Sequence, residues 1–338
     1  MSNRPSILIV GVGSIGERHL RCFAETGRVD VSLCEVNPEL SRNVAERYGV
    51  KKTFNRLDEA LAESPTAAVI CTPAHLHVPM ALQAASARAH LLIEKPLGAS
   101  LKGVKELEEL ITNGSLVATV GYVFRAHPAL NAMREAIGGG RFGAPLQITS
   151  TTGQNFPFYR PGYERTYYKN HATGGGAVQD ALTHVINAGE WLVGSINRLT
   201  ADSGHQALEG VEVEDTVHVL TRHGKVMGCF SLNQYQAPNE CTITVVCENG
   251  TARFEYHHCR WRWMTEPSGQ WQDEASPPLE RDTLFIRQAN AFLDAIDRTS
   301  PPLCSLADAA QTLRVNLAIL ASAEKREWQN VQKEPAYA

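Results

Sequence analysis

The first third of the chain alternates between short apolar runs and longer stretches whose apolar residues recur at helical spacing. The apolar runs are Ile7–Val10, Val29–Cys34, Ala67–Cys71, His90–Ile93 and Leu116–Val120. The helical stretches between them include Pro38–Tyr48, His77–Arg88 and Leu101–Thr112. Strands that alternate with helices form parallel sheets through right-handed crossovers, and continuous apolar strands are typical of sheets covered on both faces. Residues 1–122 are therefore predicted to form a doubly wound α/β domain.

The pattern changes after Tyr122. Short extended segments now follow one another with turn signals such as Asn249-Gly250 between them. These segments are Leu146–Thr152, Ile196–Asp202, Thr216–Arg222, Lys225–Tyr235, Cys241–Glu248, Thr251–His258 and Arg260–Glu266. The helical patterns are Ala129–Ala136, Ala177–Val193, Thr283–Asp297 and Ser305–Trp328. Consecutive strands with short turns indicate a mainly antiparallel sheet. Residues 123–338 are predicted to form an α+β domain, whose C-terminal helix could pack back on the first domain.

Composition narrows the class of protein. The 338 residues are 43% hydrophobic and 20% charged, as in a globular protein with a full core. A net charge of −4 gives no general attraction to nucleic acid or to an anionic membrane. Eight cysteines without a C-x-x-C pair are typical of reduced core thiols. Together with the lack of a signal-peptide layout or a long apolar run, they predict a soluble, cytoplasmic protein.

A glycine fingerprint follows the first strand directly. Gly11-Val12-Gly13-Ser14-Ile15-Gly16 lies between that strand and the first helix. The three glycines of such a motif permit a tight turn, close approach of a pyrophosphate, and close packing of helix on strand. The pyrophosphate would then lie on the N–H groups at the helix N-terminus.

The second strand ends at Glu35, 19 residues after Gly16. A carboxylate there can accept hydrogen bonds from the adenosine ribose hydroxyls and would repel a 2′-phosphate. No arginine or lysine follows immediately. The sequence therefore favours NAD(H) over NADP(H). The alternative to a dinucleotide site is a plain glycine turn with an ordinary surface glutamate.

Three more motifs complete a set. They are Cys71-Thr72-Pro73-Ala74-His75-Leu76-His77, Glu94-Lys95-Pro96, and Gly174-Gly175-Gly176-Ala177-Val178-Gln179-Asp180-Ala181-Leu182-Thr183-His184. In this order, and over nearly the whole chain, they resemble the glucose–fructose oxidoreductase and myo-inositol dehydrogenase superfamily (Gfo/Idh/MocA). The resemblance implies a Rossmann domain, a second domain with a large open sheet, and a nicotinamide site between them. It also implies that the open sheet pairs with another subunit, so a homodimer or homotetramer is expected.

The resemblance assigns roles to individual residues. Lys95 matches the lysine of the family's E-K-P motif, which also contributes Glu94 to the cofactor site. Asp180 and His184 match the D-x-x-x-H of the inositol enzymes, as the catalytic pair. Thr72, Pro73 and His77 match the loop beside the cofactor. Arg125 matches the segment entering the second domain, where His127 departs from the family pattern.

These residue types suit hydride transfer at a carbon that bears a hydroxyl group. Histidine titrates nearest neutral pH and can take the departing proton, and a nearby aspartate can orient it. Asp180 and His184 are four apart, so one face of a helix would present both. Lys95 can donate a hydrogen bond to the substrate oxygen. The spacing of Asp180 and His184 alone favours a solvated pair on an amphipathic helix, and the catalytic interpretation depends on the glycine run and on Glu94-Lys95-Pro96.

Two further segments carry candidate chemistry. The loop Asn155–His171, with Tyr167, is rich in aromatic and basic side chains that suit a sugar or carboxylate. It could equally be ordered by packing or by a neighbouring subunit. His257-His258-Cys259 could suggest a metal, but adjacent strand residues point to opposite faces, so no metal is expected.

The sequence therefore predicts an NAD(H)-dependent dehydrogenase or reductase acting on a polyhydroxylated small molecule. Lys95, Arg125, Tyr167, Asp180 and His184 are the expected substrate contacts. Two alternatives remain open. One is a hydrolase of the same superfamily that uses NAD transiently, without net redox change, and the other is a non-catalytic NAD-binding regulatory protein.

Overall fold

The computed structural model describes residues 4–331, with the side chain of Ala275 left aside, and divides them into two compact units. The first comprises the residues up to Ala126 together with Leu279–Ala310. The second comprises His127–Pro278 and the residues from Gln311 on. The sequence placed a single boundary after Tyr122, whereas the contacts divide the chain after Ala126 and return it to the first unit near its end.

The first unit contains a six-stranded parallel sheet in the order β3-β2-β1-β4-β5-β6. Its strands are β1 (Ser6–Val10), β2 (Asp30–Cys34), β3 (Thr53–Phe54), β4 (Ala67–Ile70), β5 (His90–Ile93) and β6 (Ala118–Val120). Its helices are α1 (Ser14–Glu25), α2 (Pro38–Tyr48), α3 (Leu57–Ala62), α4 (His77–Ser86), α5 (Val104–Gly114) and α9 (Thr283–Ile296). This strand order is that of the dinucleotide-binding Rossmann fold. The predicted α/β domain is confirmed.

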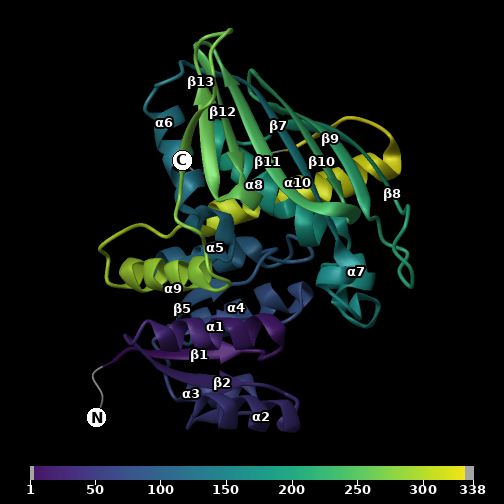
Figure 1. The fold of residues 1–338 in the computed structure, drawn as a ribbon. Helices are drawn as coiled ribbons and strands as arrows, with labels where there is room; N and C mark the ends of the chain where they lie inside the picture. The colour runs from purple at the N-terminus through teal and green to yellow at the C-terminus, as the bar shows by residue number, and fades with distance from the viewer. Residues whose placement is uncertain (1–3, 332–338) are drawn as a thin grey trace. The chain divides into compact units, whose positions relative to one another are not determined.

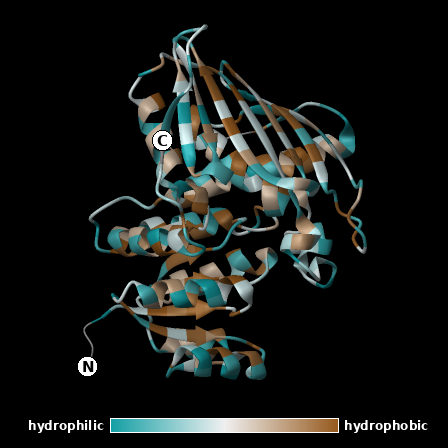
Figure 2. Cartoon of the chain, in the orientation of Figure 1, coloured by the Kyte–Doolittle hydropathy of each residue, from teal (hydrophilic) through white to brown (hydrophobic). Residues whose placement is uncertain are grey.

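The buried strands of this sheet account for its apolar runs. Ile7, Leu8 and Ile9 of β1 are fully buried, which is why the run shows no alternation. Figure 2 shows the strands of this sheet as mostly hydrophobic ribbons. Side chains of α9 join the cluster on one face of the sheet, so a segment from the end of the chain completes the core of its beginning.

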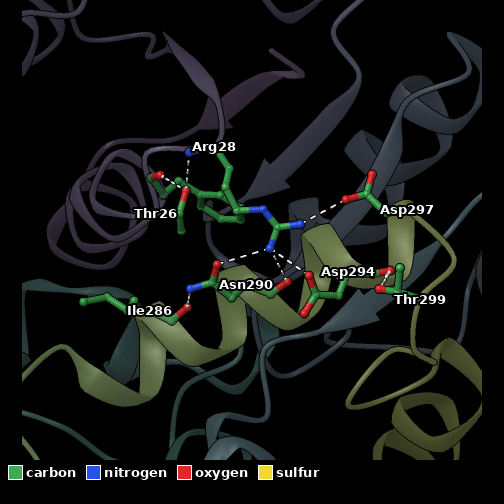
Figure 3. A network of polar contacts seen from close by, with 8 residues as sticks. Thr26, Arg28, Ile286, Asn290, Asp294, Asp297 and Thr299 are labelled. Atoms are coloured by element: carbon green, nitrogen blue, oxygen red, sulfur yellow. Dashed lines mark hydrogen bonds and ion pairs between the residues drawn. The ribbon is translucent and has the colours of Figure 1, made fainter.

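A polar network fixes α9 to the start of the chain (Figure 3). The Arg28 guanidinium donates to Asp294 Oδ1 at 2.7 Å and to Asp297 Oδ2 at 3.0 Å. It also donates to the side-chain oxygen of Asn290 at 3.2 Å. Just before the helix, Arg21 forms a two-point contact with Asp282. These contacts set the position of α9 along the Rossmann sheet.

The second unit contains a nine-stranded sheet in the order β14-β13-β12-β11-β7-β10-β9-β8-β15. Its strands are β7 (Pro145–Asn155), β8 (Arg198–Gly204), β9 (Thr216–His223), β10 (Val226–Asn233), β11 (Tyr235–Cys247), β12 (Gly250–Glu255), β13 (Arg260–Met264), β14 (Gln272–Ala275) and β15 (Gln329–Asn330). All neighbouring pairs are antiparallel except β7 and β10, which are parallel. The predicted mainly antiparallel sheet is confirmed.

Helices cover one face of this sheet. They are α6 (Pro128–Gly138), α8 (Thr183–Val193) and α10 (Leu306–Lys325), and Figure 1 shows α8 and α10 lying along the sheet. Phe230 and Ile148 lie under Gly189 of α8, and a Cβ on that glycine would approach Phe230 to 2.8 Å. Alternating burial along β9 and β10 leaves the other set of side chains, including Leu220 and Met227, half exposed.

Across the described part of the chain, no helix is both long enough and apolar enough to cross a membrane.

Candidate functional site

The glycine fingerprint forms a tight loop between β1 and α1. Gly11 has a φ of +80°, which favours glycine. A Cβ on Gly16 would lie 1.8 Å from the carbonyl oxygen of Gly11, so only glycine allows α1 to start this close to the loop. Around Gly13, by contrast, a Cβ would meet nothing within 4 Å. Gly13 and Ser14 are exposed at the helix start, and Ile15 packs inward. The loop therefore fits a dinucleotide pyrophosphate at the N-terminus of α1.

Glu35 lies just beyond β2 and braces this loop. Its carboxylate accepts the N–H of Val12 at 2.9 Å through Oε2 and the N–H of Asn37 at 3.0 Å through Oε1. Asn37 in turn caps α2 by accepting the N–H groups of Glu39 and Leu40. A carboxylate has about four acceptor positions, so these two contacts leave capacity for ribose hydroxyls. The backbone contacts hold Glu35 at the edge of the glycine loop, as the NAD(H) prediction requires.

The loop after β4 faces the glycine turn. The methyl carbon of Thr72 lies 3.1 Å from where a Cβ on Gly11 would stand, and Pro73 is exposed. His77 differs from both because it is buried. Its ring nitrogens lie 2.8 Å from the Pro96 carbonyl oxygen and 2.6 Å from that of Thr72. Burial lowers the pKa of His77, although both carbonyl contacts oppose that effect. The buried His77 ring thus connects the loop after β4, through Thr72, to the loop after β5, through Pro96.

Glu94 and Lys95 lie side by side at the end of β5 but in different surroundings. Glu94 is buried and accepts the backbone N–H of Lys95 at 3.0 Å. Its other oxygen lies 2.7 Å from His19 Nε2, on the second turn of α1. Burial alone would raise the pKa of Glu94, but the His19 contact and neighbouring positive charge leave it below its ordinary range. Lys95 itself is half-buried.

His19 is a residue that the sequence analysis missed. It is 1% exposed and links the dinucleotide helix to the segment that carries Lys95. Its position three residues after Gly16, on the buried side of α1, was the only available signal. Gly121 packs against the Glu94 carboxylate, and a Cβ on that glycine would lie 2.9 Å from Glu94 Oε1. Glu94 therefore lies inside the fold, and its assignment to the cofactor site stays a prediction.

Arg125 and His127 lie where the chain leaves the first unit. Arg125 is 4% exposed and donates to the Leu303 carbonyl oxygen at 3.1 Å and to Asp308 Oδ2 at 2.8 Å. Its role as a substrate contact stays a prediction. His127 begins α6 and is fully buried, with its ring edge-on to Phe254 at a centroid distance of 4.8 Å. Its departure from the family pattern therefore falls on a core position.

The helix predicted over Ala177–Val193 is present, but its first part is not an α-helix. Residues Val178–Leu182 form a π-helix that continues into α8. The expected α-helical spacing of Asp180 and His184 is therefore wrong for this segment. π segments bond i to i+5 and are frequent at functional positions. Asp180 and His184 are both half-buried, whereas most of their neighbours on the helix are buried.

The aromatic loop before this helix is partly packed and partly exposed. Phe156, Tyr163 and Tyr168 are buried in a cluster with Leu208, Val211 and Val213. Phe158, Tyr159 and Tyr167 are exposed. Tyr167 donates its hydroxyl to Asp180 Oδ1 at 2.7 Å. Packing therefore orders the buried part of the loop and leaves the rest exposed to solvent. Tyr167 lies in the exposed part and contacts the helix that carries Asp180.

The His257-His258 pair does not lie on a strand as predicted. The preceding strand β12 ends at Glu255, and Tyr256–His258 form a short 3₁₀ turn in which the two rings lie 4.3 Å apart. The prediction that they point to opposite faces of a strand is therefore wrong. Among residues 4–331, no group of three or more His, Cys, Asp or Glu side chains is arranged to hold a metal ion. The eight cysteines, all within that range, form no disulfide, and six of them are buried.

Comparison with known proteins now defines the class. The model of an oxidoreductase family with an NAD-binding Rossmann fold matches residues 6–122. The GFO/IDH/MocA C-terminal domain matches residues 130–253. The protein is therefore an NAD-binding oxidoreductase, and the chain belongs to the Gfo/Idh/MocA family.

Individual relatives of this chain are named as dehydrogenases. Levoglucosan dehydrogenase of Pseudarthrobacter phenanthrenivorans is 24% identical, over 96% of this chain and 97% of its own. Inositol 2-dehydrogenase of Rubrobacter xylanophilus is 25% identical, over 57% of this chain and 53% of its own. A solved structure of levoglucosan dehydrogenase in complex with NADH superposes with a TM-score of 0.91 at 21% identity, covering 98% of this chain and all of that one. These relatives are dehydrogenases and lend no support to the hydrolase or the regulatory alternative.

Proposed function

We propose that this oxidoreductase transfers a hydride between NAD(H) and a CH–OH carbon of a sugar, a cyclitol or a related polyhydroxylated molecule. The observation that carries the proposal is that Asp180 and His184 are both half-buried on one helix, and that Asp180 accepts the Tyr167 hydroxyl. Relatives named for levoglucosan and inositol support a substrate of this class. The protein is further proposed to act in the cytoplasm.

Each residue has a proposed task. When bound, the nicotinamide of NAD accepts or returns the hydride. His184 takes the proton of the substrate hydroxyl, since a histidine is poised to do so near neutral pH. Asp180 orients the imidazole. Lys95 donates a hydrogen bond to the substrate oxygen as negative charge develops. Arg125 is the remaining proposed substrate contact, and Tyr167 is placed beside Asp180, to which its hydroxyl donates at 2.7 Å.

The test is a substrate panel followed by variants. Sugars, anhydrosugars, inositols, uronates and nucleotide-sugars are incubated with NAD, and NADH absorbance is followed. With the best substrate, His184→Ala is expected to lower kcat by about 10²–10⁴-fold, the usual contribution of an acid–base group. Lys95→Ala is expected to lower kcat by about 10²–10³-fold, as for the loss of one donor to a developing oxyanion. The exposed His258→Ala and Lys102→Ala serve as matched controls. Turnover of His184→Ala at the wild-type rate would exclude His184 as the base, and a panel without any NADH would exclude the substrate class.

We also propose a homodimer or homotetramer formed through the uncovered face of the nine-stranded sheet. Paired residues form a continuous row across that face, which begins with charged and polar residues, becomes apolar at Cys229 and Leu220, and ends at Thr200. The row runs through Arg253, Thr244, Thr149, Cys229, Leu220 and Thr200. Leu220 is 51% exposed, although it lies in the middle of a strand. A second copy is the proposed cover for this row.

Light scattering after size-exclusion chromatography tests the assembly. Leu220→Glu is expected to reduce the mass to that of a monomer, because a charge would be buried in the interface. Leu146→Glu is the matched control, since Leu146 is also 51% exposed but occupies the other alternating set of its strand. A monomeric wild-type protein, or an assembly unaffected by Leu220→Glu, would contradict the proposal.

A further inference from the structure

The contact between Tyr167 and Asp180 joins two segments that are 13 residues apart. The Tyr167 hydroxyl donates to Asp180 Oδ1 at 2.7 Å. The Tyr167 side chain is exposed, so burial of its ring does not determine where its hydroxyl lies. The backbone that carries Tyr167 therefore helps to set its position.

That backbone is held by the glycine run before the helix. Gly175 packs directly on the carbonyl groups of the tyrosines, and a Cβ there would lie 2.1 Å from Tyr168 O and 2.6 Å from Tyr167 O. Gly176 N–H donates to Tyr168 O at 3.0 Å. Thr173 Oγ1 donates to Tyr167 O at 2.7 Å. No other residue type could occupy position 175 without displacing Tyr167.

The two glycines beside it turn the chain. Gly174 and Gly176 have φ values of +91° and +87°, where side chains are strained. They return the chain so that the tyrosine loop and the helix start lie against each other. We call Gly174–Gly176 the glycine clamp.

Both sides of the clamp are anchored independently. On the loop side, Tyr168 is 1% exposed within the aromatic cluster around Phe156. On the helix side, buried Glu214 accepts the N–H of Val178 at 2.8 Å and also bonds the ring of His171. Tyr167 thus extends from a fixed loop towards a fixed helix.

We propose that Tyr167 is a positioning residue, which the glycine clamp places so that its hydroxyl holds the Asp180 carboxylate in one orientation. A hydrogen bond donated to one oxygen of a carboxylate fixes the plane of the group, and a residue that orients a histidine requires a fixed plane. This inference rests on the proposed function, because Asp180 has a catalytic task only there.

A double-mutant cycle tests whether Tyr167 acts through Asp180. Tyr167→Phe removes only the hydroxyl and is expected to lower kcat on the order of ten-fold, as for one charge-assisted hydrogen bond. In an Asp180→Ala background the same change should have less than about a two-fold effect. Tyr48→Phe is the control, because Tyr48 donates to the Glu17 carboxylate at 2.8 Å elsewhere in the chain. Equal losses in both backgrounds would overturn the proposal.

A spectroscopic arm needs no substrate. Tyrosine labelled with ¹³C at Cζ gives one resonance for each tyrosine, and that of Tyr167 is identified by its loss in Tyr167→Phe. The resonance is expected to move in Asp180→Ala and to stay in place in Asp202→Ala. If Asp180→Ala leaves it unmoved, the contact and the proposal fail whatever the activity. Failure of the whole substrate panel, by contrast, would overturn the proposed function without changing this result.

A substitution in the glycine clamp tests whether the clamp places Tyr167. Gly175→Ala is expected to shift the Tyr167 resonance and to lower kcat at least as far as Tyr167→Phe. Gly138→Ala is the control, since a Cβ there would meet nothing within 4 Å. An unshifted resonance and wild-type kcat in Gly175→Ala would refute the role of the clamp. Should that variant fail to fold, the cycle and the resonance of Tyr167 still decide the proposal.

Discussion

Glu35 shows how one carboxylate serves both the fold and the cofactor. One of its oxygens accepts the N–H of Val12 in the glycine loop, and the other accepts the N–H of Asn37 at the start of α2. Glu35→Ser is expected to narrow the preference for NAD(H) over NADP(H), because repulsion of the 2′-phosphate disappears. Dissociation constants for both cofactors, measured by fluorescence titration, provide the test. Tighter binding of NADP(H) than NAD(H) by the wild-type protein would refute the role assigned to Glu35.

Buried Glu94 is expected to matter for stability as well as for the position of Lys95. Glu94→Gln places an amide where a carboxylate accepts from His19 and from Lys95 N–H, so one donor loses its acceptor. The cost is about 1–3 kcal/mol in the free energy of unfolding at neutral pH. Exposed Glu63→Gln is the control.

The pH dependence of this difference has a defined sign. The pKa of Glu94 is lowered in the folded protein. A lowered carboxyl pKa contributes stability above the unfolded pKa, and that stability is lost as pH falls through the folded value. The difference in the free energy of unfolding between wild type and Glu94→Gln should therefore become smaller at acidic pH. Urea unfolding at several pH values would show this. A constant gap would mean that the charge of Glu94 is not involved.

The positions of several site residues could be predicted from the sequence, but the directions of their side chains could not. The motifs located Lys95, Asp180 and Glu35 because each follows a recognisable strand or glycine run. They could not show that Glu94 points inward to His19, or that Arg125 contacts Leu303 and Asp308. Those directions depend on side-chain geometry and on chain segments far away in sequence.

At the scale of elements, hydrophobic periodicity predicted most of the helices and strands. Pro38–Tyr48 and His90–Ile93 have the predicted bounds, and most other ends moved by a few residues. The strand predicted from Cys241 begins earlier, at Tyr235. The two-residue strand β3 is too short to leave a pattern. The π-helix at Val178–Leu182 was missed because it differs from an α-helix by hydrogen-bond register rather than by residue preference.

The attachment of α9 gives a prediction at this scale. Arg28→Ala removes contacts to Asn290, Asp294 and Asp297. Because these ion pairs are partly exposed, the expected loss is about 1–2 kcal/mol in the free energy of unfolding rather than a full buried-pair penalty. Arg56→Ala, which removes only exposed local pairs with Asp58 and Glu59, should change the free energy of unfolding much less, because water screens both pairs. Equal losses in the two variants, measured by urea unfolding, would show that the network adds nothing specific.

At the scale of the whole molecule, the first unit is built from two separated stretches of chain. Ala289, Phe292 and Leu293 of α9 belong to the same buried cluster as Ile7, Leu20 and Phe23. A fragment of residues 1–126 therefore lacks part of its own core. It is expected to bind a hydrophobic dye and to unfold without a cooperative transition. Joining residues 279–310 to it through a flexible linker should restore cooperativity, and a cooperative transition in the shorter fragment would contradict this.

The same interleaving imposes an order on biosynthesis. A nascent chain emerges from the ribosome with its dinucleotide fingerprint first, yet the helix that seals that region is synthesised only after β14, more than 250 residues later. Until then, the apolar surface awaiting Phe292 and Leu293 stays open to chaperones and to other nascent chains. Competence to bind NAD is thus expected to appear late in translation rather than when residue 122 leaves the exit tunnel. Slowing elongation just before Thr283 should prolong that vulnerable interval and lower the soluble yield.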